Sequence, residues 1–358
     1  MIFSCNKFLS GMVFLAAAII ASPAGANDSS AAIGLGGLEL RQNNEISLDK
    51  EELFISRHRI TVRYRFTNTT DRDIETLVAF PLPVLPDGVN RASQGDRGYP
   101  DWDSLDFRTL VDGKPAALER IDVAMVGDRP VDTRLKELGW PVRWFDFDPS
   151  KSSLSFLERI NHLPQAERDA LIAEGLLTLY GTPGLPTIAL LGRSDGRLMP
   201  AWTVTTNITR IQRFPAGRTI TVEHSYDPIN GGSVGGNLLR SGRKRRGVGT
   251  YYKRRFCVAG EFLAQFDRKV RKIRKAHRLE SDYYLESLVG YVLKSGANWR
   301  GPIGDFRLVI DSEDPLTMAS LCMPGFRRIS PTQVEFHERN FKPDRDLDVL
   351  FVHWDGLN

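Results

Sequence analysis

A strictly alternating segment, Ile60 to Thr67, is the feature that most constrains the fold of this chain. The apolar residues occupy the even positions, Ile60, Val62, Tyr64 and Phe66. The polar residues occupy the odd positions, Thr61, Arg63, Arg65 and Thr67. A period of two places all the apolar side chains on one face, as a half-buried antiparallel strand requires. Turn-forming residues follow at Asn68 to Asp71, and a second apolar run, Leu77 to Phe80, ends at Pro81. The pattern predicts a β-hairpin packed on a sandwich-like core.

The first residues of the chain predict export. Lys7 supplies a positive charge, Phe8 to Ile20 is a mostly apolar run, and Ala24 to Ala26 fits the small-residue cleavage site of a signal peptide. The run is shorter than the roughly 20 apolar residues of a transmembrane helix. We therefore expect a signal peptide at residues 1–26 and a periplasmic mature chain. Secretion, or anchoring by an uncleaved signal, is the alternative.

The cysteines agree with an oxidising compartment. Once residues 1–26 are removed, Cys257 and Cys322 are the only cysteines left in the sequence. Exported proteins seldom keep free thiols, so a disulfide is favoured over two separate buried thiols. The bond would close a loop of about 66 residues, which is worth roughly 4 kcal/mol in the chain-entropy model.

Strand and helix patterns divide the chain into six parts. These are the signal peptide (1–26), a β-rich part (27–129), a helical insertion (130–199), strands that complete the first β region (200–230), a basic loop and helix (231–280), and a helix with a C-terminal β region (281–358). The predicted class is mainly β (α+β), with sandwich-like antiparallel sheets. The mature chain carries 47 Lys and Arg against 44 Asp and Glu, so its overall charge implies no polyanionic partner.

Local signals place several elements within these parts. Asp112-Gly113 lies between two β-like runs and marks a hairpin. Residues 230–249 are rich in Gly and Arg, which predicts a mobile loop. Glu261 to Arg278 has the apolar stripe of an amphipathic helix. Ser281 is expected to cap a further helix that carries Leu285, Leu288 and Val292.

Five short motifs occur in order along the chain. They are Asn27 to Ala31, Glu52 to Ser56, Val78 to Pro83, Phe214 to Gly217 and Ile329 to Gln333. With these motifs the chain resembles the exported bacterial family catalogued as domain of unknown function 4424. The motifs span nearly the whole mature chain, so the likeness is one of full length. The resemblance implies export and brings no assigned activity or catalytic residue.

One segment matches a catalytic motif by its letters. Gly231 to Gly235 reads G-x-S-x-G, with Ser233 at the position of the nucleophile. A nucleophile elbow needs a strand before the serine and a helix directly after it. Here Gly236 and an Arg-rich stretch follow, which favours a flexible loop. A hydrolase that uses Ser233 is therefore the alternative hypothesis, and no catalytic residue is predicted.

The acidic residues near the C-terminus approach the spacing of a calcium loop. Asp344, Asp346 and Asp348 are followed by Asp355, but Val349 replaces the glycine that the sharp turn needs. Solvated carboxylates are the better interpretation. The histidines are scattered singly and form no zinc motif, so we predict neither a metal site nor a cofactor.

The strongest unusual feature is a basic segment. Between Arg240 and Arg278 there are 15 Lys and Arg against two acids, Glu261 and Asp267. The candidate ligand-binding residues are Arg243, Lys244, Arg245, Arg246, Arg271 and Arg274. They could contact an anionic envelope component or a membrane surface, and nucleic acid is not expected for an exported chain without a recognisable nucleic-acid-binding fold. The alternative is a solvated face that merely keeps the protein soluble.

These features predict an exported envelope protein without enzymatic activity. Its role would be binding or structural, through sandwich surfaces and the basic segment. A structural subunit of an envelope assembly is a further alternative, which would show as a contiguous exposed apolar patch.

Overall fold

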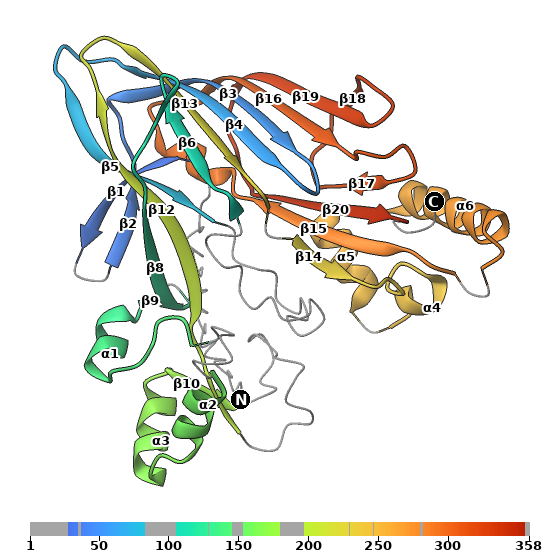
Figure 1. The fold of residues 1–358 in the computed structure, drawn as a ribbon, viewed down its shortest axis with the longest axis horizontal. Coiled ribbons are helices and arrows are strands. Elements are labelled where there is room, and N and C mark those ends of the chain that lie inside the picture. Colours follow the sequence, from blue (N-terminus) through green and yellow to red (C-terminus); the bar gives the residue numbers. More distant parts are fainter. Residues whose placement is uncertain are drawn as a thin grey trace, which may run out of the picture.

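The computed structural model describes residues 28–34, 37–82, 105–127, 129–144, 153–179, 197–228, 230–245, 247–279 and 282–354 (Figure 1). The expected signal peptide at 1–26 lies outside these residues. Within them, no helix combines the length and the apolar character needed to cross a bilayer.

An eight-stranded sheet forms the spine of the molecule. Its strands, in spatial order, are β18 (Arg327–Arg328), β19 (Gln333–Phe341), β16 (Ile303–Asp311), β3 (Ile46–Ile55), β4 (Ile60–Asn68), β13 (Thr219–Tyr226), β6 (Arg108–Val111) and β7 (Lys114–Pro115). Neighbours are antiparallel except β16 and β3, which run parallel. β4 and β13 alternate between buried and more exposed residues, as strands with one covered face do.

Two smaller sheets pack on the inward face of this spine. The six-stranded sheet contains β2 (Gly37–Arg41), β1 (Ser29–Gly34), β5 (Ile74–Pro81), β12 (Thr203–Phe214), β8 (Glu119–Val126) and β9 (Arg129–Pro130). The four-stranded sheet contains β14 (Asn230–Ser233), β15 (Leu285–Tyr291), β20 (Leu347–His353) and β17 (Met318–Ser320). One apolar core joins all three sheets, and it includes Tyr64 of β4, Phe80 of β5 and Phe351 of β20. The fold is therefore a sandwich whose second layer is shared by two sheets.

Helices build two further cores on the outer sides of the smaller sheets. α1 (Asp132–Glu137), α2 (Ser153–Asn161) and α3 (Gln165–Ala173) lie between β8 and β12 in the chain, with a short hairpin of β10 (Leu177–Leu179) and β11 (Leu198–Pro200). They pack around the buried Trp202. α4 (Arg240–Arg243), α5 (Val248–Phe256) and α6 (Gly260–Ala276) cover the four-stranded sheet through Phe266, Tyr284 and Leu350. A 3₁₀ helix, η4 (Lys294–Asn298), follows β15.

Several expected elements are confirmed. The chain is mostly β with antiparallel sheets, and the alternating segment is strand β4. Asp112-Gly113 forms the two-residue turn between β6 and β7, where both residues have positive φ angles of 48° and 76°. α6 covers the amphipathic segment, and it buries Phe266, Val270 and Ile273.

The hairpin predicted from β4 and β5 is wrong. β4 pairs with β3 and β13, whereas β5 pairs with β1 and β12 in the other layer. The turn at Asn68 to Asp71 therefore carries the chain across the sandwich. The buried Asn68 side chain donates to the carbonyl oxygens of Arg72 (2.7 Å) and Phe214 (2.9 Å), which fixes this corner. The true hairpin is β3–β4, closed by residues 56–59.

Two predictions downstream also need correction. The helix expected from Ser281 is replaced by strand β15, because both faces of this strand are covered. Val289 and Tyr291 face the main core, and Leu288 packs on the helical side. A strand that is covered on both faces does not alternate strictly between apolar and polar residues. The spacing of the apolar residues in this segment therefore resembled that of a helix. The loop expected at 230–249 contains β14 and α4 and the start of α5.

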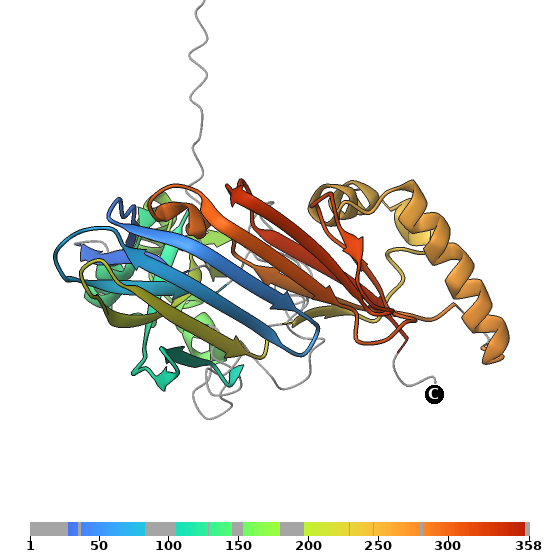
Figure 2. The same ribbon diagram turned by 90° about the horizontal axis from the view of Figure 1, so that it is seen from above.

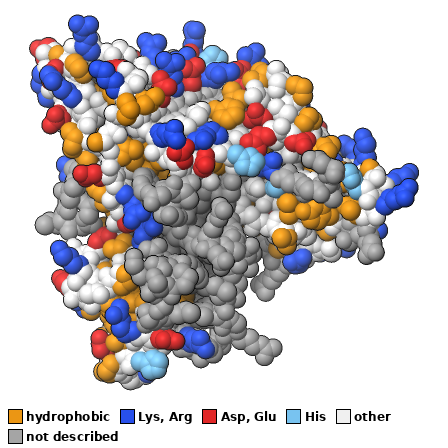
Figure 3. Space-filling view, in the orientation of Figure 1, with side chains coloured by type: hydrophobic (Ala, Val, Ile, Leu, Met, Phe, Trp, Pro, Cys, Tyr) orange, Lys and Arg blue, Asp and Glu red, His pale blue; other side chains and the backbone are white. Residues whose placement is uncertain are grey.

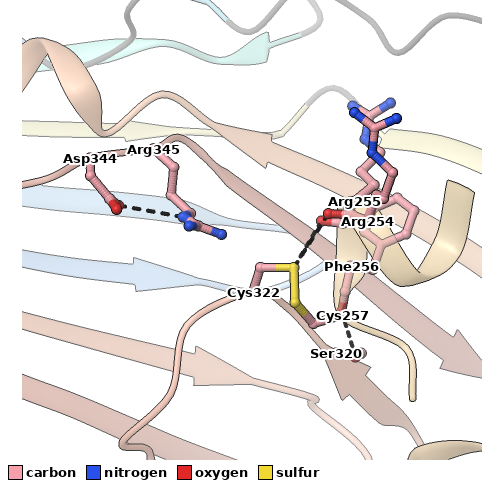
Figure 4. Close-up of a disulfide and its surroundings, with 8 residues drawn as sticks. All are labelled: Arg254, Arg255, Phe256, Cys257, Ser320, Cys322, Asp344 and Arg345. Atoms are coloured by element: carbon pink, nitrogen blue, oxygen red, sulfur yellow. Dashed lines mark hydrogen bonds and ion pairs between the residues drawn. A yellow bond between two sulfur atoms is a disulfide. The ribbon is translucent and has the colours of Figure 1, made fainter. Parts of the chain in front are cut away.

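The predicted disulfide is confirmed. Cys257 and Cys322 are bonded, with Cα atoms 4.9 Å apart (Figure 4). Cys257 ends α5 in a left-handed conformation, with φ of 53°. Beside it, the Ser320 hydroxyl donates to the Phe256 carbonyl over 2.7 Å. The bond ties the junction of α5 and α6 to the segment after β17.

Candidate functional site

The predicted basic residues lie at one end of the molecule. Figure 2 shows α6 at one extreme of the long axis, and in Figure 3 Lys and Arg side chains project from that end as well as from the upper edge of the molecule. The exposed basic side chains of the described part of this segment are Arg240, Lys244, Arg245, Lys253, Arg254, Arg268, Arg271, Lys272, Arg274, Lys275 and Arg278. We call this set the basic end.

α6 presents a cationic stripe to solvent. Its four exposed members are Arg268, Arg271, Lys272 and Lys275, and we call them the α6 stripe. Their spacing of i, i+3, i+4 and i+7 places them on one face of the helix. The buried Phe266 and Val270 lie on the opposite face, against the four-stranded sheet. The sheet therefore orients the stripe outward.

Arg243, the first of the predicted ligand-binding residues, has a structural role. Its guanidinium forms an ion pair with Asp267 of α6 and donates to the Leu238 carbonyl over 2.5 Å. It also lies 5.8 Å from the ring centroid of Phe266. These contacts hold α4 against α6 and leave the side chain only 21% exposed.

The other predicted residues occupy different environments. Lys244 and Arg245 are exposed beside α4, and Arg271 belongs to the α6 stripe. Arg274 is exposed and lies 3.4 Å from the Asp282 carboxylate, a pair that solvent screens. Arg246 lies outside the described residues. Because Arg243 contacts Asp267, the structure places the Arg243–Arg245 loop directly beside α6.

The G-x-S-x-G segment does not have the geometry of a nucleophile elbow. Ser233 ends β14, and the next helix, α4, begins only at Arg240. The Ser233 hydroxyl accepts a hydrogen bond from the Gly235 amide over 3.2 Å. No histidine of the described chain hydrogen-bonds to Ser233, so the general base that a serine nucleophile needs is not positioned here.

The acidic residues near the C-terminus serve the fold. Asp346 accepts hydrogen bonds from the amides of Leu293 and Lys294, each over 3.1 Å. Asp348 forms a 2.8 Å ion pair with Arg255 of α5. Asp355 lies outside the described residues. Among those that are described, His, Cys, Asp and Glu form no group of three or more that could hold a metal ion.

The main core contains an ion pair that the sequence did not indicate. Asp28, just before β1, is fully buried, and both of its carboxylate oxygens accept hydrogen bonds from Arg210 of β12 (3.1 and 2.6 Å). The Nε2 atom of His224, on β13, lies 3.1 Å from the Asp28 Oδ1 atom. The Trp299 indole donates to the Asp28 carbonyl over 2.6 Å. The cluster therefore links the six-stranded sheet, the eight-stranded sheet and the segment after η4.

The charges of Asp28 and Arg210 stabilise each other. Burial alone would raise the pKa of Asp28, but Arg210 and His224 outweigh it and hold the pKa well below its ordinary value. Burial lowers the pKa of His224, and this effect exceeds the opposing attraction of Asp28. His224 is therefore neutral at pH 7, and its Nδ1 atom lies 2.8 Å from the Thr109 hydroxyl.

Aromatic residues and hydroxyl groups enclose the cluster. The rings of Phe80 and Phe107 lie 4.9 and 5.4 Å from that of His224. Beside them, the hydroxyls of Tyr64 and Tyr291 share a 2.9 Å hydrogen bond. Asp28, Arg210 and His224 are each at most 5% exposed, so a substrate has no direct access to them. The arrangement is suited to holding the two layers of the sandwich together, and it exposes no reactive group to solvent.

Comparisons with solved structures include two distant likenesses. A structure described as a "putative nutrient binding protein" from Legionella pneumophila has a TM-score of 0.40 and 14% identity, over 91% of this chain and 70% of that chain. An M1 zinc metallopeptidase from Deinococcus radiodurans has a TM-score of 0.22 and 8% identity, over 87% of this chain and 43% of that one. At these scores neither likeness carries a functional argument.

No curated protein matches the chain. The family comparison is decisive, because one family's model covers nearly the entire sequence. The model described as "Domain of unknown function (DUF4424)" matches residues 26–350, a range that includes every helix and strand described above except the last three residues of β20. The chain belongs to the DUF4424 family.

Proposed function

We propose that this protein is an exported, non-enzymatic protein of the bacterial envelope that binds an anionic membrane surface through its basic end. The observation that carries the proposal is the α6 stripe, which faces solvent directly opposite the buried side of the helix. The disulfide supports export, because such bonds persist in oxidising compartments. The N-terminal signal pattern supports it independently.

The proposed attraction is electrostatic. Helices that lie on membranes usually bury an apolar face among the headgroups. The apolar face of α6 is already packed on the four-stranded sheet through Phe266, Val270 and Ile273. Each Lys or Arg close to an anionic bilayer contributes about 1 kcal/mol, and salt screens this contribution within a Debye length. Binding should therefore be reversible and should weaken as ionic strength rises.

The acidic residue next to the α6 stripe does not neutralise the stripe. Asp267 is already paired with Arg243 and lies 3.5 Å from Arg240. No ion pair joins Arg271, Lys272 or Lys275 to another described residue. An anionic surface would therefore meet these cations without first displacing an internal partner, a cost that paired charges would impose.

The exposed apolar side chains give no comparable support to the alternative hypothesis, a structural subunit of an envelope assembly. Those that are large and exposed in the described chain come from separate elements: Ile172, Leu179, Ile211, Val234, Tyr251, Leu316 and Ile329. Single exposed apolar residues are normal on monomers.

Vesicle sedimentation tests the proposal. The mature chain should sediment with vesicles that contain phosphatidylglycerol and not with pure phosphatidylcholine vesicles, at low salt. The variant Arg268→Gln/Arg271→Gln/Lys272→Gln/Lys275→Gln should bind on the order of a thousandfold more weakly, since about 1 kcal/mol is lost at each of four positions. Arg243 is excluded from this variant because it supports the fold.

A matched control removes four exposed charges elsewhere. Lys114, Lys136, Arg339 and Lys342 are exposed and lie outside the basic end. Their Gln variant has the same net charge as the stripe variant and should bind like the parent. Equal losses in both variants would show an effect of net charge alone and would reject docking through α6. Parent-like binding by the stripe variant would reject it as well.

A further inference from the structure

The outward face of the eight-stranded sheet contains a groove that is separate from the basic end. It has a cavity volume of about 660 Å³ and is lined by side chains of β16, β3, β4, β13 and β6. Ligand sites typically measure about 300–1,000 Å³. The sheet's opposite face forms the main core, so the groove lies directly over the largest cluster of buried side chains in the described chain.

Strand register arranges the lining into two rows. The first row, which we call the charged row, runs across the strands as Arg307, Glu52, Arg63, Glu223 and Leu110. The second, which we call the floor row, runs as Val309, Phe54, Thr61, Ser225 and Arg108. Neighbouring strands are about 4.8 Å apart, so each row extends over roughly 19 Å. An extended ligand can follow this direction.

The charged row is neutralised within the protein. Its basic and acidic side chains alternate, and Arg63 lies 3.5 Å from Glu223. Glu52 lies 3.0 Å from Lys50, and Arg307 lies 2.6 Å from Glu335 of β19. A strongly charged ligand would gain attraction from one set of these groups and repulsion from the other. The groove therefore does not favour a polyanion, in contrast to the basic end.

The same side chains retain hydrogen-bonding capacity. A guanidinium has five N–H donors and a carboxylate has about four acceptor sites, so a single ion pair leaves several of them free. A sugar hydroxyl both donates and accepts, and it can bond to either group. The floor row adds the hydroxyls of Thr61 and Ser225 and the apolar surface of Phe54, which suits the C–H face of a sugar ring.

We infer that this groove binds a neutral oligosaccharide, which lies across the strands with its hydroxyls on the charged row and a ring face on Phe54. The inference does not rest on membrane docking, because no residue of the basic end lines the groove. It adds a second surface to the molecule, with a ligand of different chemistry.

Calorimetric titration of the mature, oxidised protein tests the inference. The probes are three neutral tetrasaccharides: chitotetraose, cellotetraose and maltotetraose. At least one should bind with millimolar or better affinity. Arg63→Gln/Glu223→Gln keeps the net charge and should weaken that binding about tenfold, the effect of losing one to two hydrogen bonds. Phe54→Ala should weaken it by a similar factor through loss of the ring contact.

The control is another ion pair of similar exposure. Arg63 and Glu223 are 58% and 41% exposed, and Arg72 and Glu45 are 62% and 42% exposed but lie outside the groove. Arg72→Gln/Glu45→Gln should bind like the parent. Circular dichroism checks that each variant is folded. Absence of binding by all three probes overturns the inference, as does an equal loss in the control. Because neutral sugars are not attracted by the basic end, a failure of sugar binding would not affect the result expected in the vesicle experiment.

Discussion

The Asp28–Arg210 pair is the clearest case in which single residues hold separate layers together. Burying two charges is costly, and a buried pair persists only where geometry and further hydrogen bonds compensate. Here the arginine contacts both carboxylate oxygens, and Gln212 accepts a 3.2 Å hydrogen bond from the Arg210 Nε atom. Asp28 is the second residue of the expected mature chain. The pair therefore fixes the residue that precedes β1 in the core.

Replacing Asp28 by Asn should destabilise the protein strongly. The change leaves Arg210 buried without its counter-charge, and breaking a buried pair in this way costs about 3–5 kcal/mol. Urea unfolding of the parent and the variant measures the difference. Asp73→Asn is the matched control, because Asp73 pairs with Arg213 at the surface. The control should change stability much less, and equal effects of both variants would contradict the assigned role of burial.

His224 should make stability depend on pH in the mildly acid range. Its pKa in the folded protein lies below the unfolded value of about 6.5. Below about pH 6.5 the unfolded chain binds a proton that folded His224 does not, so stability falls as pH decreases. Its neighbours are Asp28, Arg210 and Thr109 and the rings of Tyr64, Phe80 and Phe107.

Urea unfolding at pH 7, 6 and 5 measures this dependence. The free energy of unfolding of the parent should decrease across the series, and His224→Gln should show a smaller decrease because it removes the titrating group. His162→Gln, at an exposed histidine, is the control and should follow the parent. A parent-like slope in His224→Gln would show that another group causes the dependence.

At the scale of elements, the sequence predicted the position of a strand more reliably than the strand with which it pairs. The alternation at residues 60–67 defines β4 because one of its faces is buried and the other is more exposed. The same alternation contains no information on the partner. β5 does not pair with β4, because the Asn68 side chain fixes a corner after which the chain enters the other layer. A polar turn sequence is compatible with either connection.

Helices were predictable where one face is buried and the other is solvated. α6 meets this condition, and its apolar stripe and its cations could both be read from spacing. β15 does not meet it, because the main core covers one of its faces and the helices cover the other. α5 begins at the end of the Gly- and Arg-rich stretch that predicted a loop, and its buried Tyr252 and Phe256 become informative only when the sheet beneath them is known.

At the scale of the whole molecule, the candidate sites differ in how far apart their residues lie in the chain. The basic end is one continuous segment, so its charge could be counted in the sequence. Asp28 and Arg210 are 182 positions apart. The groove draws on five strands between Glu52 and Val309. Such sites depend on strand order and register, which local patterns do not specify. Contacts between residues far apart in the chain are thus the part of the candidate sites that only the fold reveals.

The disulfide offers a test at this same scale, because it links a helical unit to a distant strand segment. It closes a loop with a sequence separation of 65 residues and should contribute roughly 4 kcal/mol through restriction of the unfolded chain. Reduction with dithiothreitol should lower the urea midpoint of the mature parent. Cys257→Ser/Cys322→Ser should unfold at a similarly low midpoint and should not respond to dithiothreitol. A parent midpoint that is unchanged by complete reduction would show that packing of α5 and α6 on the four-stranded sheet holds this end of the molecule without the bond.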